Sequence, residues 1–314
     1  MSLGLRQLVA RLVVLGPLAV GATGCESVEL NTPSTLTYTE DAYKAYQEAL
    51  RAYRNKEWET SRQLFSEVKR LFNYSKYAKL AELRIGDIDF NQEKYPSAIA
   101  AYRGFVKAHR DDPNVEYARY RICKALYLDI NDTFLLPPQE ERDQSTARDA
   151  YRELKSFVDR YPKSRYLVDA GYMFEVVTQR IVRHELYVAR YYLGQDKFDA
   201  TVMRVDYALD EYPGSGLDAE ALVLKAETLL KMRKRAEARA VFARVVDEHG
   251  GAFGKVAKRF LTDMGPRSDE EGRPDPEIVG QSPEQEDAET TEDEDVPDPS
   301  ELEDPEAPVE PEAP

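Results

Sequence analysis

The stretch YPKS at residues 161–164 returns as YPGS at residues 212–215, fifty-one residues further along the chain. In both copies, proline cannot continue a helix and moves the residue before it out of helical geometry. Serine is a residue type that caps a following helix, and Asp218 completes a weak capping box with Ser215 after the second copy. Helix-to-helix turns that recur at a long period are typical of α-solenoids. These stretches therefore predict an all-α repeat protein.

Apolar residues recur every three or four positions almost without a break over residues 39–265. Turn residues divide this domain into helices that pair as hairpins, with Ala150 on an inner face. The sequence predicts an α-solenoid of about five tetratricopeptide-like helix pairs, closed by a capping helix. The expected helices cover residues 43–53, 58–71, 77–91, 95–109, 114–128, 145–161, 165–193, 197–212, 216–231, 234–249 and 252–264.

One expected helix is about twice as long as the others. Apolar residues from Ala170 to Tyr191 step by four and three positions, and no proline interrupts residues 165–193. A helix of about 28 residues is roughly 40 Å long at 1.5 Å per residue. We expect this long helix in the fourth repeat, where it joins the two halves of the solenoid.

Charge is distributed unevenly along the 314 residues, whose net charge is −15. Residues 266–314 hold 20 acidic and 2 basic residues together with 10 of the 18 prolines, whereas residues 25–265 have a net charge of +1. A proline-rich segment of this charge cannot bury a core, so we predict a disordered acidic tail. Two roles stay open for it, a solvating tail and a clamp for a basic partner. The near-neutral body, without a basic stripe, argues against nucleic acid as a partner.

The first 24 residues are typical of a bacterial export signal. Arg6 and Arg11 precede an apolar run that is too short to span a bilayer. The run leads to ATGC at residues 22–25, which resembles the lipobox of bacterial lipoproteins, where cleavage precedes acylation of the cysteine. We therefore predict a lipoprotein signal peptide over residues 1–24, with an ordinary secreted protein as the alternative.

Cys25 is the predicted site of lipid attachment, and residues 25–38 are the predicted tether between lipid and domain. Several acyl chains, such as palmitate, would hold the protein on a membrane without crossing it. Glu26 occupies the position that sorts such lipoproteins, and it leaves the choice between inner and outer membrane open. Cys123, the other cysteine, is then without a disulfide partner in the chain, and we expect it to be a small buried hydrophobic residue.

No catalytic or metal-binding pattern stands out in the sequence. A phosphate loop, a glycine-rich dinucleotide turn and a nucleophile elbow are all absent from it. The three histidines are far apart, and His184 lies on an apolar stripe, where we expect a packed, hydrogen-bonded side chain rather than a ligand. We predict no enzyme, no cofactor and no metal, since a lipoprotein enzyme would rest only on the abundance of carboxylates.

A block of residues in the centre of the chain resembles the BamD family, the outer-membrane lipoproteins of the β-barrel assembly machinery. The resemblance covers about residues 38–250 and excludes the acidic tail. At residues 71–75 the chain departs from the family, which often has a further Tyr-Pro hinge there, so we expect a differently shaped first turn. Besides the two Tyr-Pro hinges, the matching residues are Pro113, Asn114, Tyr117, Arg142, Asp143, Gln144, Ala147, Ala150, Asp169, Ala170, Glu185, Tyr187, Val188, Ala189, Tyr191, Tyr192, Arg204, Val205, Ala221 and Leu222.

The resemblance implies a scaffold of five tetratricopeptide repeats on the periplasmic face of the outer membrane. Its N-terminal repeats would receive the C-terminal β-signal of unfolded outer-membrane proteins. Its C-terminal repeats would dock a POTRA domain of the β-barrel protein BamA. The alternative is another periplasmic tetratricopeptide lipoprotein that organises the cell envelope, linked to Tol or to peptidoglycan, of the CpoB type.

Two sets of residues are candidates for these contacts. Tyrosine offers apolar area with a polar end, which suits a groove for an extended peptide, although core packing is the alternative for each tyrosine. The groove candidates are Tyr43, Tyr46, Tyr77 and Tyr117. The partner-binding candidates are Arg204 and the basic run of Lys231, Arg233, Lys234 and Arg235. The alternative for the basic run is a helix C-terminus stabilised by positive charge.

Overall fold

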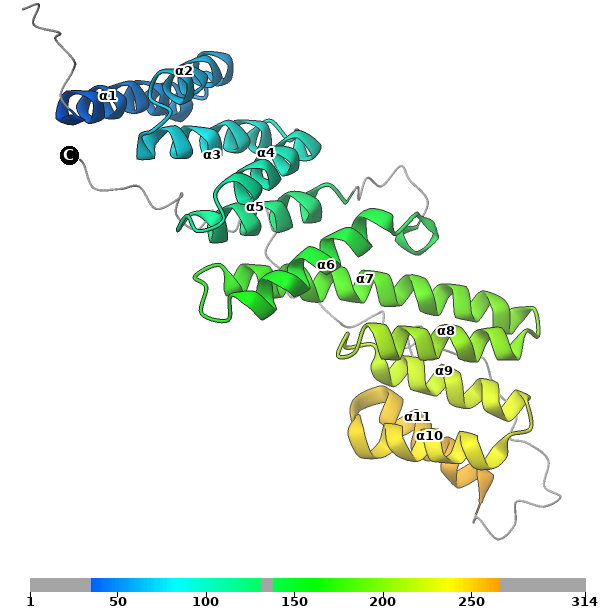
Figure 1. Ribbon diagram of the computed structural model, residues 1–314. Helices are drawn as coiled ribbons and strands as arrows, with labels where there is room; N and C mark the ends of the chain where they lie inside the picture. The colour runs from blue at the N-terminus through cyan, green and yellow to red at the C-terminus, as the bar shows by residue number, and fades with distance from the viewer. Residues whose placement is uncertain (1–34, 131–137, 266–314) are drawn as a thin grey trace, which may run out of the picture.

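The computed structural model describes residues 35–130 and 138–265. Eleven α-helices account for most of these described residues, and one turn of 3-10 helix, Gln139–Glu141, precedes α6. Figure 1 shows the helices as an elongated, staggered stack that runs from α1 at one end to α10 and α11 at the other. The helices are α1 (Thr35–Arg54), α2 (Trp58–Leu71), α3 (Lys76–Asn91), α4 (Tyr95–Ala108), α5 (Val115–Leu128), α6 (Ser145–Arg160), α7 (Leu167–Gly194), α8 (Phe198–Glu211), α9 (Asp218–Lys231), α10 (Arg235–Glu248) and α11 (Gly251–Met264).

The helices form five consecutive pairs, from α1 with α2 to α9 with α10, and α11 closes the stack against α10 and α9. This arrangement confirms the predicted all-α solenoid of tetratricopeptide type. The long helix is confirmed as well, since α7 has 28 residues, twice as many as α8. Figure 1 shows α7 extending well beyond its neighbour α6 toward the turn that leads into α8.

Four of the five pairs turn through a residue in a left-handed conformation that its residue type did not predict. Lys56, Glu93, Asp196 and Arg233 have φ angles between 56° and 61°, in the left-handed region. In each turn the N–H of this residue bonds the carbonyl three residues back, and the next N–H bonds the carbonyl five residues back. This is the Schellman motif, which satisfies the last carbonyls of a helix and reverses the chain. Because the same motif recurs in four helix pairs, these pairs are copies of one structural repeat.

The hinges between pairs share a second motif. Ser164 Oγ accepts a hydrogen bond from the Tyr166 N–H at 3.0 Å, and Ser215 Oγ accepts one from the Leu217 N–H at 3.1 Å. Both serines therefore build a turn before the helix rather than cap it, and α9 has no side-chain cap. This corrects the expected capping box of Ser215 and Asp218, because α9 begins only at Asp218 itself.

The first hinge, between α2 and α3, lacks the Tyr-Pro pair, and its serine has a different role. The Ser75 N–H bonds the Phe72 carbonyl at 2.9 Å, as the Ser164 N–H bonds the Tyr161 carbonyl at 3.0 Å. Ser75, however, is a true N-cap of α3, and its hydroxyl accepts a hydrogen bond from the Ala78 N–H. The chain thus makes a similar backbone turn here without the Tyr-Pro pair.

Three clusters of buried hydrophobic side chains run along the stack. The N-terminal cluster lies among α1, α2 and α3, the central cluster spans α3 to α9, and the C-terminal cluster lies among α9, α10 and α11. Ala150 and Cys123 belong to the central cluster, which confirms that both are buried. Burial also raises the pKa of the Cys123 thiol. Repeat proteins characteristically bury their core in this segmented way, each unit against its neighbours.

Asp87 on α3 is the centre of a buried polar network. Its carboxylate accepts hydrogen bonds from the hydroxyls of Tyr102 and Tyr117, at 2.6 and 2.7 Å. Two buried guanidinium groups lie close to it, Arg84 at 3.3 Å and Arg121 at 3.9 Å. Burial raises the pKa of both tyrosines well above the usual value. Because the partners come from α3, α4 and α5, the network ties two neighbouring pairs together.

The predicted signal peptide, Cys25, most of the tether and the acidic tail lie outside the described residues. Within the described ranges, none of the helices combines the length and the apolar character that a bilayer crossing requires.

Candidate partner-binding surfaces

Exposed hydrophobic side chains gather on α7 and α8. Tyr187 and Tyr191 lie one turn apart in the second half of α7, and Met203 and Tyr207 lie one turn apart on α8. Met203 exposes 71% of its surface, which is unusual for a side chain with no polar group. We call these four residues, together with Arg204 between the last two, the α7–α8 surface. Large exposed hydrophobic groups beside a charged residue are typical of a protein-binding site.

Arg204 connects this surface to the core. Its Nη1 lies 2.8 Å from Oε2 of Glu185 on α7, whose side chain is only 1% exposed. Arg148 on α6 reaches the other oxygen of the same carboxylate at 3.8 Å. The Arg204 side chain is itself 41% exposed. The residue predicted to bind a partner therefore also compensates a buried charge.

The basic run divides between surface and core. Lys231, Arg233 and Lys234 are exposed at the turn between α9 and α10. Arg235 is buried, and its Nη2 donates a hydrogen bond to the Met264 carbonyl at the end of α11. Arg235 thus caps a helix, which favours the structural alternative for this residue, whereas the three exposed side chains remain candidates for partner contacts.

Most of the groove tyrosines lie inside the solenoid. Tyr46, Tyr77 and Tyr117 are buried, and Tyr46 and Tyr77 pack against each other with ring centroids 5.6 Å apart. Tyr43 is half-buried and also contacts the Tyr77 ring. The three buried tyrosines therefore pack in the core, which is the alternative given above for each groove tyrosine. Their rings are not accessible to a bound peptide. The exposed aromatic group at this end of the stack is Tyr74, in the first hinge.

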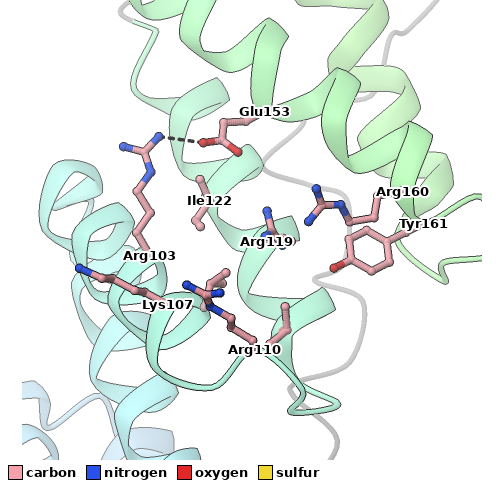
Figure 2. A pocket seen from close by; sticks show the side chains of 10 residues that line it. Arg103, Lys107, Arg110, Arg119, Ile122, Glu153, Arg160 and Tyr161 are labelled. Atoms are coloured by element: carbon pink, nitrogen blue, oxygen red, sulfur yellow. Dashed lines mark hydrogen bonds and ion pairs between the residues drawn. The ribbon is translucent and has the colours of Figure 1, made fainter.

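A cleft lined by basic side chains lies between α4, α5 and α6, and no pattern in the sequence pointed to it. It encloses about 510 Å³. Figure 2 shows the basic groups reaching it from all three helices and from the turn after α4. Five cationic side chains line it, namely Arg103, Lys107, Arg110, Arg119 and Arg160. Glu153 is the single carboxylate among its lining residues, and it pairs with Arg103 at 3.0 Å.

The remaining candidates are structural. His184 lies with Nδ1 2.6 Å from the Glu140 carbonyl oxygen, which confirms a packed, hydrogen-bonded histidine. Among the residues that the structure describes, no three His, Cys, Asp or Glu side chains are grouped so that they could hold a metal ion.

The five helix pairs, their repeated turns and the exposed α7–α8 surface define a helical-repeat protein of the tetratricopeptide class.

The sequence places this helical-repeat protein in a particular family. Residues 39–244 match the family model YfiO, described as outer membrane lipoprotein. The match covers well over half of the chain and runs from α1 into α10, so that it includes all five helix pairs. The chain belongs to this outer-membrane lipoprotein family, the BamD family, as the sequence predicted.

Several curated relatives carry the name outer membrane protein assembly factor BamD. The relative from Xylella fastidiosa strain 9a5c is 27% identical over 195 residues, which are 60% of this chain and 66% of the relative. The relative from Caulobacter vibrioides is 25% identical over 182 residues, or 58% of this chain and 57% of the relative. The relative from Neisseria meningitidis serogroup A is 25% identical over 195 residues, or 61% and 73%. The chain thus spans slightly less than two thirds of the Xylella relative and little more than half of the Caulobacter relative.

Proposed function

We propose that this protein is a lipid-anchored scaffold for the assembly of outer-membrane β-barrel proteins. The observation that carries the proposal is the extent of the family match, which over residues 39–244 reaches all five helix pairs. Relatives that match about 60% of this chain are named outer membrane protein assembly factors. An acylated Cys25 would hold the solenoid at the periplasmic face of the outer membrane.

The α7–α8 surface is the proposed docking site for a POTRA domain of a BamA-like barrel. Its exposed tyrosines and methionine supply apolar area, and Arg204 supplies a charged group that is already oriented by Glu185. Aromatic, methionine and arginine side chains are the types enriched where protein interfaces bind most strongly. Lys231, Arg233 and Lys234 are exposed one repeat further along and would extend the contact.

The N-terminal pairs are the proposed site for segments of unfolded outer-membrane proteins. Three of the predicted groove tyrosines are buried, so the contact would use Tyr74 in the first hinge and the accessible part of Tyr43. A scaffold of this kind positions two macromolecules and needs no active site. Hydrolase activity that copurifies with the full chain, and that changes with its variants, would contradict this role.

The docking proposal is tested by affinity purification of the full chain from its own membranes in mild detergent. The wild type should recover a large outer-membrane barrel protein that carries POTRA domains. Met203→Glu combined with Tyr191→Glu should reduce this recovery at least tenfold, because both changes place charge on the proposed interface. Val168→Glu combined with Ala100→Glu is the matched control, since these two side chains are also exposed but lie elsewhere.

Each outcome of the purification bears on the proposal. Equal losses in the two double variants would show that the α7–α8 surface is not the docking site. Failure of the wild type to recover any such barrel would contradict the assembly role. Recovery of Tol components or cell-wall enzymes in its place would favour the envelope-organising alternative.

A further inference from the structure

The basic cleft between α4, α5 and α6 is strongly positive. Five cationic side chains and one carboxylate, that of Glu153, line the cleft, and Glu153 already forms an ion pair with Arg103. No described residue forms an ion pair with Lys107, Arg110 or Arg160. Four cationic groups therefore share the cleft without an anion from the described part of the chain, and like charges this close together repel one another.

Arg119 adds an unsatisfied donor at the floor of the cleft. Its Nε atom is buried and has no hydrogen-bond partner among the described residues. A buried donor without an acceptor costs about 1 to 3 kcal/mol, and more when the group is charged. Figure 2 shows Arg119 beside Arg160, with Arg110 below them. An anionic oxygen between these groups would satisfy the donor and relieve the repulsion.

The shape and lining of the cleft suit a chain of carboxylates. A volume of about 510 Å³ exceeds what a single ion fills, and the arginines come from three helices and from the turn after α4. Arginine binds carboxylates with two parallel hydrogen bonds, which favours a row of acidic side chains. Val106, Val115 and Ile122 line the cleft as well, so the methylene groups and prolines of a peptide would also find apolar contacts there.

Complementary charge is present in the same chain. Residues 266–314 carry 20 acidic and 2 basic residues, whereas residues 25–265 are nearly neutral. This segment begins at a fixed point, because Arg235 and Arg239 donate hydrogen bonds to the Met264 and Gly265 carbonyls at 3.0 and 2.8 Å. The origin of the acidic segment is therefore held at the C-terminal end of the stack.

The acidic segment is long enough to reach the cleft. Six helix-to-helix steps separate α5, the middle helix of the cleft, from α11, and packed helices lie about 8 to 10 Å apart, so the distance across the stack is roughly 50 to 60 Å. A flexible chain of 49 residues has a root-mean-square span of about 35 to 42 Å, and it reaches roughly 160 Å when fully extended. Tethering also gives the segment a local concentration on the order of millimolar, which favours even a weak contact.

We propose that acidic residues of segment 266–314 bind in the basic cleft between α4, α5 and α6 of the same molecule. Other acidic ligands would compete with the segment for the same cationic side chains. The contact depends on opposite charges that are partly open to solvent, so it weakens as salt is added. It requires no partner protein, and its test is therefore independent of the assembly role.

The experiment is carbodiimide cross-linking of the full chain in detergent, followed by mass spectrometry. The reagent joins a lysine amine to a carboxylate in direct contact, and Lys107 is a lysine of the cleft. Links from Lys107 to residues 266–314 should be at least fivefold more frequent than links from Lys197. Lys197 is an exposed lysine between α7 and α8, nearer along the stack to the start of the acidic segment. The excess should disappear in 0.5 M NaCl.

Two charge-reversal variants make the test specific. Arg110→Glu combined with Arg160→Glu should reduce the Lys107 links at least fivefold. Lys44→Glu combined with Arg51→Glu changes the net charge equally on exposed positions of α1 and should leave the links unchanged. Thermal melting checks that both variants are folded, and Arg110→Gln with Arg160→Gln replaces the first variant if it is not.

Three results would overturn the proposal. Links from Lys107 that are no more frequent than those from Lys197 would mean that the segment does not occupy the cleft. Equal losses in the cleft and control variants would mean that only the overall charge matters. Cross-links between isotope-labelled and unlabelled copies, in a mixture of the two, would mean that the segment binds another molecule instead of its own.

Discussion

Arg204 on α8 donates a hydrogen bond to Glu185 on α7 over 2.8 Å, so a side chain at the candidate interface also holds two helices together. The Glu185 carboxylate is almost completely buried, and its second cation, Arg148, lies further away at 3.8 Å. A buried carboxylate requires such partners, because transfer of a charge from water into a protein interior is costly.

Replacement of Arg204 with alanine should therefore destabilise the fold as well as weaken partner binding. We expect a loss of about 1 to 3 kcal/mol in the free energy of unfolding, since Arg148 still compensates part of the Glu185 charge. Urea denaturation of the full chain measures this loss. Met203→Ala, at the neighbouring exposed position, should change stability by less than about 0.5 kcal/mol. If both variants unfold at the same urea concentration, the ion pair does not contribute to stability.

Asp87 should be among the most sensitive positions of the solenoid. Its replacement with alanine removes the carboxylate that faces Arg84 and Arg121 in the core, and we expect a loss of about 3 to 5 kcal/mol. Glu248 pairs with Arg244 at the surface, where both side chains are more than half exposed, so Glu248→Ala should cost no more than about 1 kcal/mol. Chemical denaturation of the two variants compares these values. Similar losses would show that the Asp87 network is not a buried one in solution.

Alkaline pH should weaken the fold through Tyr53. Burial, assisted by the negative charge of Asp87, raises the pKa of Tyr53 from 10.0 to about 12. The folded state therefore keeps this proton at pH values where the unfolded state has released it, and stability falls as pH rises. The contribution is fully present below pH 10 and is lost between pH 10 and about 12. Tyr53→Phe should show a shallower loss of unfolding free energy over this range, and an identical slope would contradict the assignment.

Two helix glycines should respond in opposite directions to alanine. A Cβ atom at Gly86 would lie 2.8 Å from Cε1 of Tyr102, which is held in place by its hydrogen bond to Asp87. Gly86→Ala should therefore cost about 1 to 3 kcal/mol. Gly104 is exposed on α4 and has no atom within 4 Å of the same position, so Gly104→Ala should stabilise by about 0.5 to 1 kcal/mol. Thermal melting of the two variants tests both signs.

The left-handed turn residues offer a further comparison. Glu93 has a φ of 58°, a conformation that is costly for most side chains, so Glu93→Gly should raise stability by about 0.5 to 1 kcal/mol. Asp196 has almost the same angle, but aspartate tolerates this region better, and Asp196→Gly should gain less. Equilibrium denaturation measures the two gains in the free energy of unfolding. A larger gain for Asp196→Gly than for Glu93→Gly would mean that side-chain contacts, rather than backbone strain, determine the stability of these turns.

Local physics explains how much of the fold could be predicted. Proline at positions 162 and 213 cannot continue the helix before it, and an uninterrupted apolar stripe extends a helix, so these helix ends and the length of α7 followed from the sequence. The Schellman turns were missed because their central residues, such as Arg233, belong to types that rarely adopt a positive φ. The serine of each hinge was assigned to a cap because an ST-turn and an N-cap use the same residue type.

The candidate sites depend on contacts that periodicity does not specify. A tyrosine such as Tyr77 fits the apolar stripe of a helix whether it faces the core or a groove. Arg235 belongs to an apparent surface run, yet its partner is the Met264 carbonyl 29 residues away. The basic cleft combines Arg103, Arg119 and Arg160, which only the packing of three helices brings together. Such sites can be found only in the structure.

The division of the core into three clusters also bears on how the two ends of the molecule communicate. The N-terminal and C-terminal clusters share no buried residue with the central one and adjoin it at α3, and at α8 and α9, where Leu209 packs against both clusters. Allosteric coupling needs an element with two arrangements that both sites can bias, and a segmented stack transmits little of the free energy released at one end. Events at the first pair should therefore leave the affinity of the α7–α8 surface nearly unchanged. The proposed scaffold could therefore exchange a protein bound at the first pair while the α7–α8 surface stays docked.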